Sequence, residues 1–549
     1  GTGADPVIAV ARPGRTSKPA AADDAAKGTA SPADPPGGRA VPATAVRAPM
    51  GRRVRERLTR DRLAFLLLLI AVAGIGFVAR FLVETRHGGH LGVGAYDDGV
   101  YYAAAAQLLH GHLPYRDYLF VQPPGIAVLL TPFPLLARLV GDPAAMYSLR
   151  VAFELLGGLN AALAAAGLRR FGWPASVTGG FLYAVFFPAV YDERTALLEP
   201  LGSTGMLVAV LVLGLVRDGR LAPKWLALCG VALGLAIDVK IWYIVPLAVI
   251  AAFAVGGRLR VIVAAAVTVV VCYLPFFLAA PVDSFRQIVL DQLGRTGHLS
   301  VADRFASLLG VDGVGPFSTI PRLKPADAVT LAALGLGALL VIAFADRRAW
   351  VLIALLVANV LVVMQAPSFF EHYAALTAAP LVLVIGVGVG RLVDQLRRRP
   401  ARIAAVALIV VAIAGLNVRR SSERVDRPVP VAALQAAAAR IHGCIVSDEP
   451  DLLATMGVLT RDLDRGCPLE PDMSGISFDP AGQVPGKPDL GRTKNPVYQG
   501  LVLRYLRSGD AFIAVRKGAA ISAATKAELA RNRVLFAHGA WIIRAGGQP

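Results

Sequence analysis

The sequence is short of charged residues. Only 17% of its 549 residues are Asp, Glu, Lys or Arg, whereas 55% are hydrophobic, and the mean hydropathy is +0.58. Soluble domains carry about a quarter charged residues. A soluble core absorbs only part of such a shortfall, and runs of about 20 apolar residues that recur along a chain need lipid around them. The composition therefore indicates a polytopic α-helical membrane protein.

Several signatures of nucleotide, redox and zinc chemistry are missing as well. The sequence contains no Walker loop, no CxxC pair and no HExxH. The glycine-rich stretch GVGVG at 386–390 lies inside an apolar run and indicates helix packing rather than a nucleotide site. These absences argue against a pump driven by cytoplasmic nucleotides.

Basic residues are in excess, and they are confined to short segments between apolar runs. The formal net charge is +18. Arginine-rich clusters occur at 51–62, 169–170, 216–220, 256–260, 346–348 and 397–402. Basic clusters between apolar runs are typical of membrane proteins that follow the positive-inside rule. We therefore interpret the cations as determinants of topology, with anionic membrane lipid as a secondary partner, and we expect no nucleic acid.

The apolar runs predict about eleven transmembrane helices, each near 20 residues long. They fall at about 63–84, 146–168, 174–191, 197–216, 224–238, 241–256, 260–280, 328–345, 349–365, 374–391 and 402–417. The proline-broken run at 123–141 is interpreted as a re-entrant or interfacial helix, because an additional crossing there would place the later arginine clusters outside. With this count the basic clusters lie inside, and most loop carboxylates lie outside.

This topology divides the chain into three regions. Residues 1–60 are rich in Ala, Pro, Gly, Asp and Arg, and we expect a disordered cytoplasmic tail without a secretory signal. Residues 61–417 form the transmembrane domain, with a first outer loop at 85–124. Residues 418–549 are more polar and predict a small extracytoplasmic α/β domain. The protein is thus expected in the cytoplasmic (inner) membrane, with its N-terminus inside and its C-terminus outside.

Two cysteines fall in the predicted C-terminal domain. Cys444 and Cys467 would lie in an oxidising compartment, where a disulfide persists. Two unpaired thiols remain the alternative, since nothing in the sequence places the two residues close together.

The first outer loop carries adjacent aspartates, Asp97 and Asp98, close to Tyr102. Partial desolvation and a like-charged neighbour raise the pKa of a carboxyl group, which suits a general base that removes a proton from a sugar hydroxyl. The alternative is that both aspartates cap the helix that follows, and capping is compatible with catalysis. The pair could also ligate a divalent cation, and the residues alone leave this question open.

Other outer segments supply candidate binding residues. Lys240 lies at the outer end of a tight hairpin, against the positive-inside trend, and could bind an anion such as a lipid phosphate or simply snorkel. Glu199 and Arg194 could form a polar pocket wall or only local ion pairs. Arg116 and His372 are further candidates for contacts with phosphate or sugar, although a lone interfacial histidine is more often structural.

Taken together, five motifs occur in an order that resembles the GT-C glycosyltransferases, in the branch of bacterial protein O-mannosyltransferases and the lipid A aminoarabinose transferase. They are YDDGVYYAAAAQLLHGHLPYRD, VQPPGIAVLL, LLEPLGSTGMLV, GLAIDVKIWYIVPL and EHYAALTAAPLVLV. The resemblance covers about residues 63–391. The acidic pair of that family is Asp-Glu, whereas this sequence has Asp-Asp.

The resemblance implies an inverting transfer of a sugar, mannose-like or another pentose or hexose, from a polyprenyl-phosphate donor. The acceptor would be a glycan, lipid or protein of the cell envelope. Asp97 would be the general base and Asp98 would orient acceptor or donor. Lys240, with Arg116 or His372, would hold the donor phosphate. The bias toward Ala, Gly, Val and Arg suggests a high-GC genome such as that of an actinobacterium.

Two other function classes stay open at this point. A secondary transporter or flippase of a lipid-linked sugar should place ionisable groups near the middle of the membrane, whereas these acids gather at one face. A scaffold would use only its outer C-terminal domain for binding. The glycosyltransferase interpretation makes a geometric prediction that separates it from both: Asp97, Glu199, Lys240 and His372 should converge on one outward cavity.

Overall fold

The computed structural model describes residues 52–86, 88–295, 297, 299–311, 325–420, 425–487, 490–516 and 520–547. Its contacts divide the chain into a unit Gly1–Arg60 and a much larger unit Asp61–Pro549, and the description below concerns the larger one. Most of the predicted N-terminal tail lies outside the described residues. Its end, from Arg52, belongs to helix α1 (Arg52–Arg86).

Every segment that the sequence predicts as a span is helical. The helices are α1, α5 (Asp142–Leu168), α6 (Trp173–Val185) with α7 (Phe187–Glu193), α8 (Glu199–Arg217), α9 (Leu226–Val239), α10 (Ile244–Phe253), α11 (Arg258–Ala279), α15 (Pro325–Phe344), α16 (Trp350–Gln365), α17 (Ala375–Asp394) and α18 (Arg399–Arg420). Of the described helices, 6 are long and apolar enough to cross a membrane, or 7 if α6 and α7, bent by 52°, count as one span. The protein is therefore a multi-pass membrane protein, and the count of eleven crossings stays a prediction.

Short helices fill the connections. They are α2 (Asp97–Leu109), α3 (Gly125–Leu130), α4 (Pro132–Val140), α12 (Pro281–Phe285), the π-helix η4 (Arg286–Leu290), α13 (Asp291–Leu293), α14 (Val301–Leu309) and the 3-10 turns η1 (Arg169–Phe171), η2 (Pro223–Trp225), η3 (Ile241–Tyr243), η6 (Arg347–Ala349) and η7 (Glu371–Ala374). The run at 123–141 thus forms two helices of 6 and 9 residues. Neither matches the length of about 20 residues that a crossing needs. Leu139 on α4 is 84% exposed, as expected of a helix that lies at the membrane interface.

The C-terminal domain is α/β, as predicted. It contains α19 (Val431–Ala438), β1 (Ile445–Ser447), α20 (Pro450–Thr455), α21 (Leu459–Asp464), the 3-10 turns η8 (Gly475–Ser477), η9 (Pro480–Gly482) and η10 (Arg492–Lys494), α22 (Pro496–Leu506), β2 (Ala511–Ile513), α23 (Ala523–Ala530), β3 (Val534–His538) and β4 (Trp541–Ala545). The strands form one sheet in the order β1-β2-β4-β3, parallel between β1 and β2 and antiparallel elsewhere. A disulfide joins Cys444 to Cys467, whose Cα atoms are 5.5 Å apart, and it ties the start of β1 to the chain after α21.

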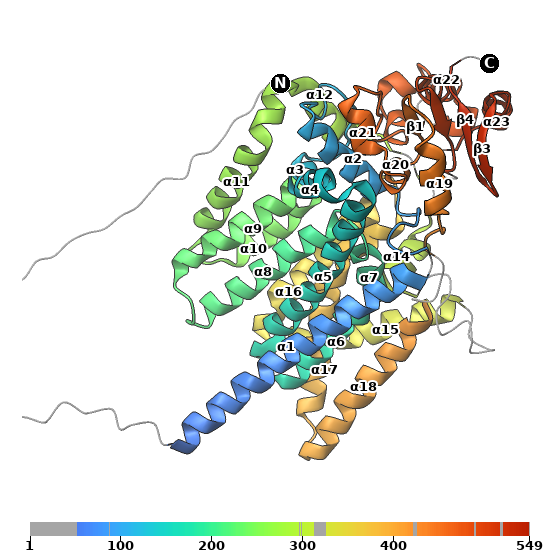
Figure 1. Cartoon of the computed structure of the whole chain (residues 1–549). Helices are drawn as coiled ribbons and strands as arrows, with labels where there is room; N and C mark the ends of the chain where they lie inside the picture. Colours follow the sequence, from blue (N-terminus) through green and yellow to red (C-terminus); the bar gives the residue numbers. More distant parts are fainter. Residues whose placement is uncertain are drawn as a thin grey trace, which may run out of the picture. The chain divides into compact units, whose positions relative to one another are not determined.

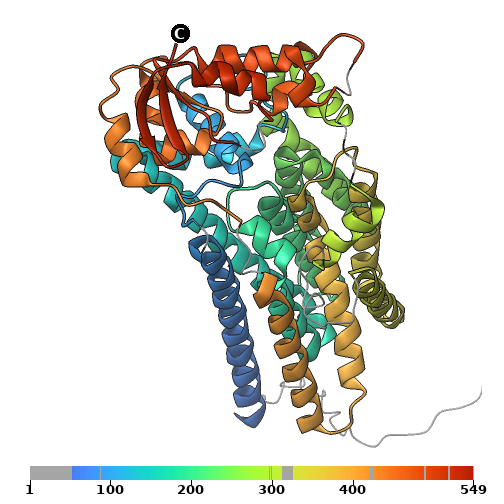
Figure 2. The same cartoon turned by 90° about the vertical axis from the view of Figure 1, so that its right-hand side faces the viewer.

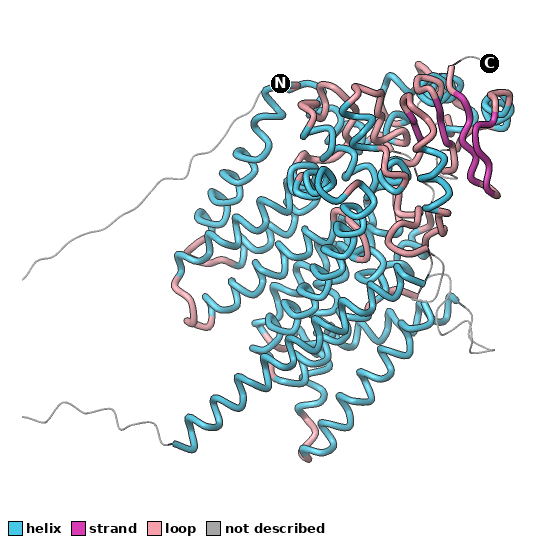
Figure 3. Tube along the Cα trace, viewed as in Figure 1, coloured by secondary structure: helices cyan, strands magenta, loops and turns pink. Residues whose placement is uncertain are grey.

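The C-terminal domain packs on the first outer loop rather than standing apart from it. Figures 1 and 2 show its helices and strands at one end of the helical bundle, beside α2, and Figure 3 shows all strands gathered there. One apolar core contains both Tyr102 of α2 and Leu452 of α20. At Gly99, a Cβ atom would lie 2.5 Å from the backbone nitrogen of Asp451, so this close approach of α2 and α20 requires glycine. The two regions therefore share a core at the predicted catalytic loop.

Candidate active site

A pocket lies at this junction and has walls from both domains. It encloses about 1000 Å³, part of which is open to solvent. The transmembrane domain contributes the polar or charged residues Asp97, Tyr101, Gln122, Arg295, Glu371 and His372, and the C-terminal domain contributes Asp472, Ser474, Arg492 and Arg516. The predicted catalytic loop thus faces a second wall that is far away in the sequence.

Asp97 is the first residue of α2 and lines this pocket. The preceding residue, Tyr96, has a φ of 34°, a conformation that strains a bulky side chain and recurs at functional sites. The carboxylate of Asp97 is 35% exposed, and its Oδ2 lies 3.9 Å from Nε2 of His372. The side chain opens only into the pocket, and the surrounding protein desolvates it. This desolvation, followed by the charge of Asp472, raises the pKa of Asp97 to about 7, and Arg516 opposes this rise. Asp97 can therefore accept a proton near neutral pH.

Asp98, unlike Asp97, is not among the residues that line this pocket, so its setting differs from the one expected of a residue that contacts substrate. Successive helical residues are about 100° apart around the axis, so neighbouring carboxylates face different surroundings. Asp98 is fully buried, and its Oδ2 lies 2.8 Å from Nη2 of Arg150. It also accepts hydrogen bonds from the hydroxyl of Thr195 and from the N–H of Gly99. Asp98 thus anchors the start of α2, and the like-charged neighbour that affects Asp97 is Asp472.

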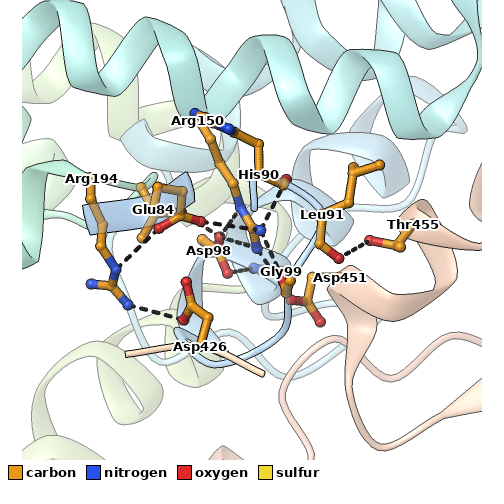
Figure 4. Close-up of polar contacts among 12 residues, drawn as sticks. Glu84, His90, Leu91, Asp98, Gly99, Arg150, Arg194, Asp426, Asp451 and Thr455 are labelled. Carbon is orange, nitrogen blue, oxygen red and sulfur yellow. Dashed lines mark hydrogen bonds and ion pairs between the residues drawn. The ribbon is translucent and has the colours of Figure 1, made fainter. Parts of the chain in front are cut away.

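The ion pair of Asp98 belongs to a larger buried network (Figure 4). Its charged members are Glu84, Asp98, Arg150, Arg194, Asp426 and Asp451. Nη2 of Arg150 lies 2.8 Å from Asp98 and 3.3 Å from Asp451, so one guanidinium group holds α2 and α20 together. The carbonyls of His90 and Gly92 accept two further bonds from Arg150. The network therefore connects the C-terminal domain to the loop that presents Asp97.

The network has fewer cations than carboxyl groups. Four carboxyl groups face two guanidinium groups, and all of these side chains are at most 3% exposed. An unpaired buried charge is strongly unfavourable, so protons must occupy part of the network near neutral pH. Burial, followed by the charge of Asp98, raises the pKa of Asp451 to about 8, while Arg150 opposes the rise. Asp451 is therefore the group of the C-terminal domain that holds such a proton.

Of the four residues expected to converge on one outward cavity, two line the pocket and two do not. Asp97 and His372 line the pocket. Lys240 and Glu199 form a buried ion pair directly behind it. Nζ of Lys240 lies 4.1 Å from the ring centroid of Tyr373, which itself lines the pocket. Lys240 is therefore paired with a protein carboxylate rather than presented to the pocket.

Three other predicted binding residues lie elsewhere. Arg116 is 48% exposed and pairs with the adjacent Asp117, Nη2 to Oδ2 at 2.7 Å. Arg194 is fully buried and neutralises Glu84 and Asp426, so it stabilises the network rather than a pocket wall. Tyr102 is fully buried in the core shared by the two domains. Both arginines therefore pair with carboxylates of the protein itself rather than with a ligand in the pocket.

Besides Glu371, which adjoins the predicted His372, four charged residues of the pocket were not predicted from the sequence. Arg295 had a usable signal, because it is a cation in an outer loop, as is Lys240. Asp472, Arg492 and Arg516 had none, because the sequence does not show that they reach the first outer loop. The contacts are direct: Oη of Tyr96 donates to Oδ1 of Asp472 at 3.0 Å across 376 residues of sequence, and the guanidinium carbon of Arg516 lies 3.0 Å from the ring centroid of Tyr96.

Comparison with known proteins identifies the fold. No family model and no curated protein matches the sequence. Among solved structures, ArnT from Cupriavidus metallidurans in the apo state has a TM-score of 0.58 at 15% identity, covering 89% of this chain and 100% of that chain. The same protein bound to undecaprenyl phosphate gives 0.51 at 16% identity, with coverage of 88% and 99%. An Archaeoglobus fulgidus oligosaccharyltransferase tethered to an acceptor peptide gives 0.50 at 14%, with coverage of 82% and 68%. The chain has a GT-C fold.

The likeness to ArnT covers both the transmembrane and the C-terminal region of this chain, because it extends over 89% of its length. The resemblance seen in the sequence ended near residue 391, so the structure extends it to the domain that carries Arg492 and Arg516. Among the described residues, no group of three or more His, Cys, Asp or Glu side chains is placed to hold a metal ion. The pocket places the carboxyl group of Asp97 near arginine side chains from two walls.

Proposed function

We propose that this protein is a membrane glycosyltransferase that moves a sugar from a polyprenyl-phosphate donor to an envelope acceptor, with Asp97 as general base. The observation that carries the proposal is the setting of Asp97: a carboxyl group with a pKa of about 7, in a pocket that also contains Arg295 and Arg516. A general base is most effective when its pKa lies near the working pH.

The reaction would proceed as an inverting displacement. A hydroxyl group of the acceptor gives its proton to Asp97 while its oxygen attacks the anomeric carbon of the donor sugar. The bond between that carbon and the phosphate oxygen breaks, and its electron pair leaves with the polyprenyl phosphate. Arg295 and His372, both in the transmembrane wall of the pocket, would stabilise the negative charge that develops on the leaving phosphate. The pair Lys240–Glu199 would hold Tyr373 in that wall.

A lipid-linked donor fits the surroundings of Arg295. This residue follows the short helices α12, η4 and α13, which expose apolar side chains such as Val282 at 76% and Phe285 at 54%. Apolar side chains exposed in this way are suited to contact with lipid. The ArnT structure with bound undecaprenyl phosphate shows that one protein of this fold binds a polyprenyl phosphate. The site would face the outer side of the cytoplasmic membrane, and the transferred sugar would be mannose or another hexose or pentose.

The test uses the full chain in liposomes, with a panel of polyprenyl-phosphate sugars and a membrane extract as the source of acceptors. The wild type should release polyprenyl phosphate, and Asp97→Asn should reduce this release by about 10²–10⁴-fold because the proton acceptor is lost. Asp117→Asn is the matched control, since Asp117 lies in the same loop but pairs with the exposed Arg116. If no donor in the panel is consumed, or if Asp97→Asn consumes donor as fast as the wild type, the proposal is wrong. Sugar movement across the membrane without donor breakdown would instead support a flippase.

A further inference from the structure

Two arginines of the C-terminal domain meet at a single neutral group in the pocket. Nη1 of Arg516 donates to Oγ of Ser474, and Nη1 of Arg492 lies 3.3 Å from the same oxygen. Two guanidinium groups this close repel each other, and burial together with the charge of Arg516 lowers the pKa of Arg492. An anion bound between the two groups would relieve this repulsion and accept charge-assisted hydrogen bonds from both.

The nearest carboxylate of this wall is already occupied. Oδ1 of Asp472 accepts from Oη of Tyr96 at 3.0 Å and from the N–H of Gly475 at 2.8 Å. It therefore has structural partners of its own, although its charge also acts on both arginines.

Aromatic rings hold the planes of both guanidinium groups. Arg516 lies over Tyr96, and Arg492 lies over Phe478 at 5.2 Å from the ring centroid. Stacking of this kind engages the face of a guanidinium group and leaves its edge for hydrogen bonds, of which Arg492 already makes one from Nε to Oγ of Ser477 at 2.9 Å. Both arginines line the pocket, so the pair is a preorganised receptor for a planar or tetrahedral anion.

The position of this receptor assigns it to one of the two substrates. Asp97 is within electrostatic reach of Arg295 and of Arg516. Arg295 follows the apolar interfacial helices, from which a lipid-linked donor would enter, whereas Arg492 and Arg516 belong to the wall built by the C-terminal domain. In the inverting displacement proposed above, the acceptor oxygen attacks the anomeric carbon from the face opposite the leaving phosphate. Arg295 and Arg492 both pack on the ring of Phe478, at 4.7 Å and 5.2 Å from its centroid, so the donor and acceptor parts of the pocket would adjoin each other at this ring.

We propose that Arg492 and Arg516 bind an anionic group, a phosphate or a carboxylate, carried by the acceptor. The proposal rests on the proposed function, because it divides the pocket between a lipid donor and an acceptor. It names the acceptor class as an acidic glycan or a phosphorylated lipid or glycan, rather than a neutral hydroxyl compound. It also gives the C-terminal domain a role in selecting the acceptor.

The test measures binding to the purified full chain in detergent by calorimetry, first without lipid and then after saturation with undecaprenyl phosphate. Glucose 6-phosphate, glucuronate and neutral glucose serve as acceptor-side probes, and the first two distinguish phosphate from carboxylate. On the saturated protein, at least one anionic probe should bind about tenfold or more tightly than glucose, the factor expected from one charge-assisted contact. Arg516→Gln and Arg492→Gln should abolish this preference and change the Kd for undecaprenyl phosphate by less than about twofold.

Two controls separate loss of charge from loss of fold. Arg504→Gln removes an exposed arginine from α22 of the same domain and should preserve the preference. Arg516→Lys keeps the charge and should retain part of it, while the melting temperature of each variant reports on folding.

Either of two outcomes overturns the proposal. One is equal binding of glucose and of both anions to the wild type. The other is that the wild type, once saturated with undecaprenyl phosphate, binds neither anionic probe, while both glutamine variants no longer bind undecaprenyl phosphate. That result would place the two arginines in the donor site and would leave the proposed function intact. Failure of the proposed function would look different: the wild type would neither bind undecaprenyl phosphate nor release it from any donor.

Discussion

Replacement of Asp451 by asparagine should make the stability of the protein less dependent on pH. Asp451 is fully buried, lies 3.3 Å from Arg150, and has a pKa raised to about 8 by burial and by Asp98. The raised pKa means that the folded protein holds a proton at Asp451 that the unfolded chain, with an ordinary carboxyl group, releases. Stability from this proton is fully present below the unfolded pKa and is lost as the pH rises through the folded pKa.

The magnitude follows from proton linkage. Between the two pKa values, one extra proton in the folded state changes the free energy of unfolding by about 1.4 kcal/mol per pH unit. From pH 5.5 to pH 7.5 the wild type should therefore lose about 2–3 kcal/mol that Asp451→Asn does not lose. Groups that face Asp451 from the neighbouring elements are Asp98 on α2, Arg150 on α5, Asp426 and Glu449, and these are unchanged in the variant.

Thermal unfolding of the detergent-purified protein, measured across this pH range, checks the prediction. The melting temperature of Asp451→Asn relative to the wild type should rise steadily with pH. A variant that is destabilised by the same amount at every pH would refute the reasoning, because it would mean that Asp451 is ionised throughout and that its pair with Arg150 is simply broken. Such a break typically costs about 3–5 kcal/mol.

Two further predictions concern the pocket and the contact between domains. The rate of donor turnover should rise with pH and level off near pH 7, as Asp97 loses its proton. Asp472→Asn should move this rise to lower pH, because the charge of Asp472 raises the pKa of Asp97. If the rise stays at the same pH in the variant, a group other than Asp97 controls it. Gly99→Ala should destabilise the protein by about 1–3 kcal/mol, since the added methyl group would overlap the backbone of Asp451. Gly500→Ala on α22, where nothing lies within 4 Å of the new methyl group, should be neutral or slightly stabilising, and equal melting temperatures for both variants would contradict the close packing of α2 on α20.

Hydropathy and charge placement predicted the helical part of the molecule well, because membrane insertion depends on local composition. All predicted spans are helices, and the proline-broken run at 123–141 forms two short helices, since Pro132 begins the second of them. The α/β character of the C-terminal region was also readable from its polar, mixed pattern. The place where that region packs was not, because it depends on contacts such as Gly99 with Asp451 that no local pattern encodes.

The candidate site could likewise be predicted only in part from the sequence. A charged residue in an outer segment indicated that it needs a partner, but not whether that partner is a ligand or another side chain. In the structure, Lys240 pairs with Glu199. Arg194 pairs with Glu84 and Asp426. The adjacent aspartates looked equivalent in the sequence, and only the turn of the helix separates the pocket-facing one from the one that is paired in the core.

The central claim is that Asp97 is the proton acceptor of a polyprenyl-phosphate-dependent sugar transfer. The most direct measurement is the rate of polyprenyl phosphate formation as a function of pH, at saturating donor, for the wild type and for Asp97→Asn of equal melting temperature. The account predicts an acid limb near pH 7 in the wild type, and a slow rate without that limb in the variant, since the group that titrates is gone. A variant that turns over donor at the wild-type rate, or that keeps the same limb, would contradict it.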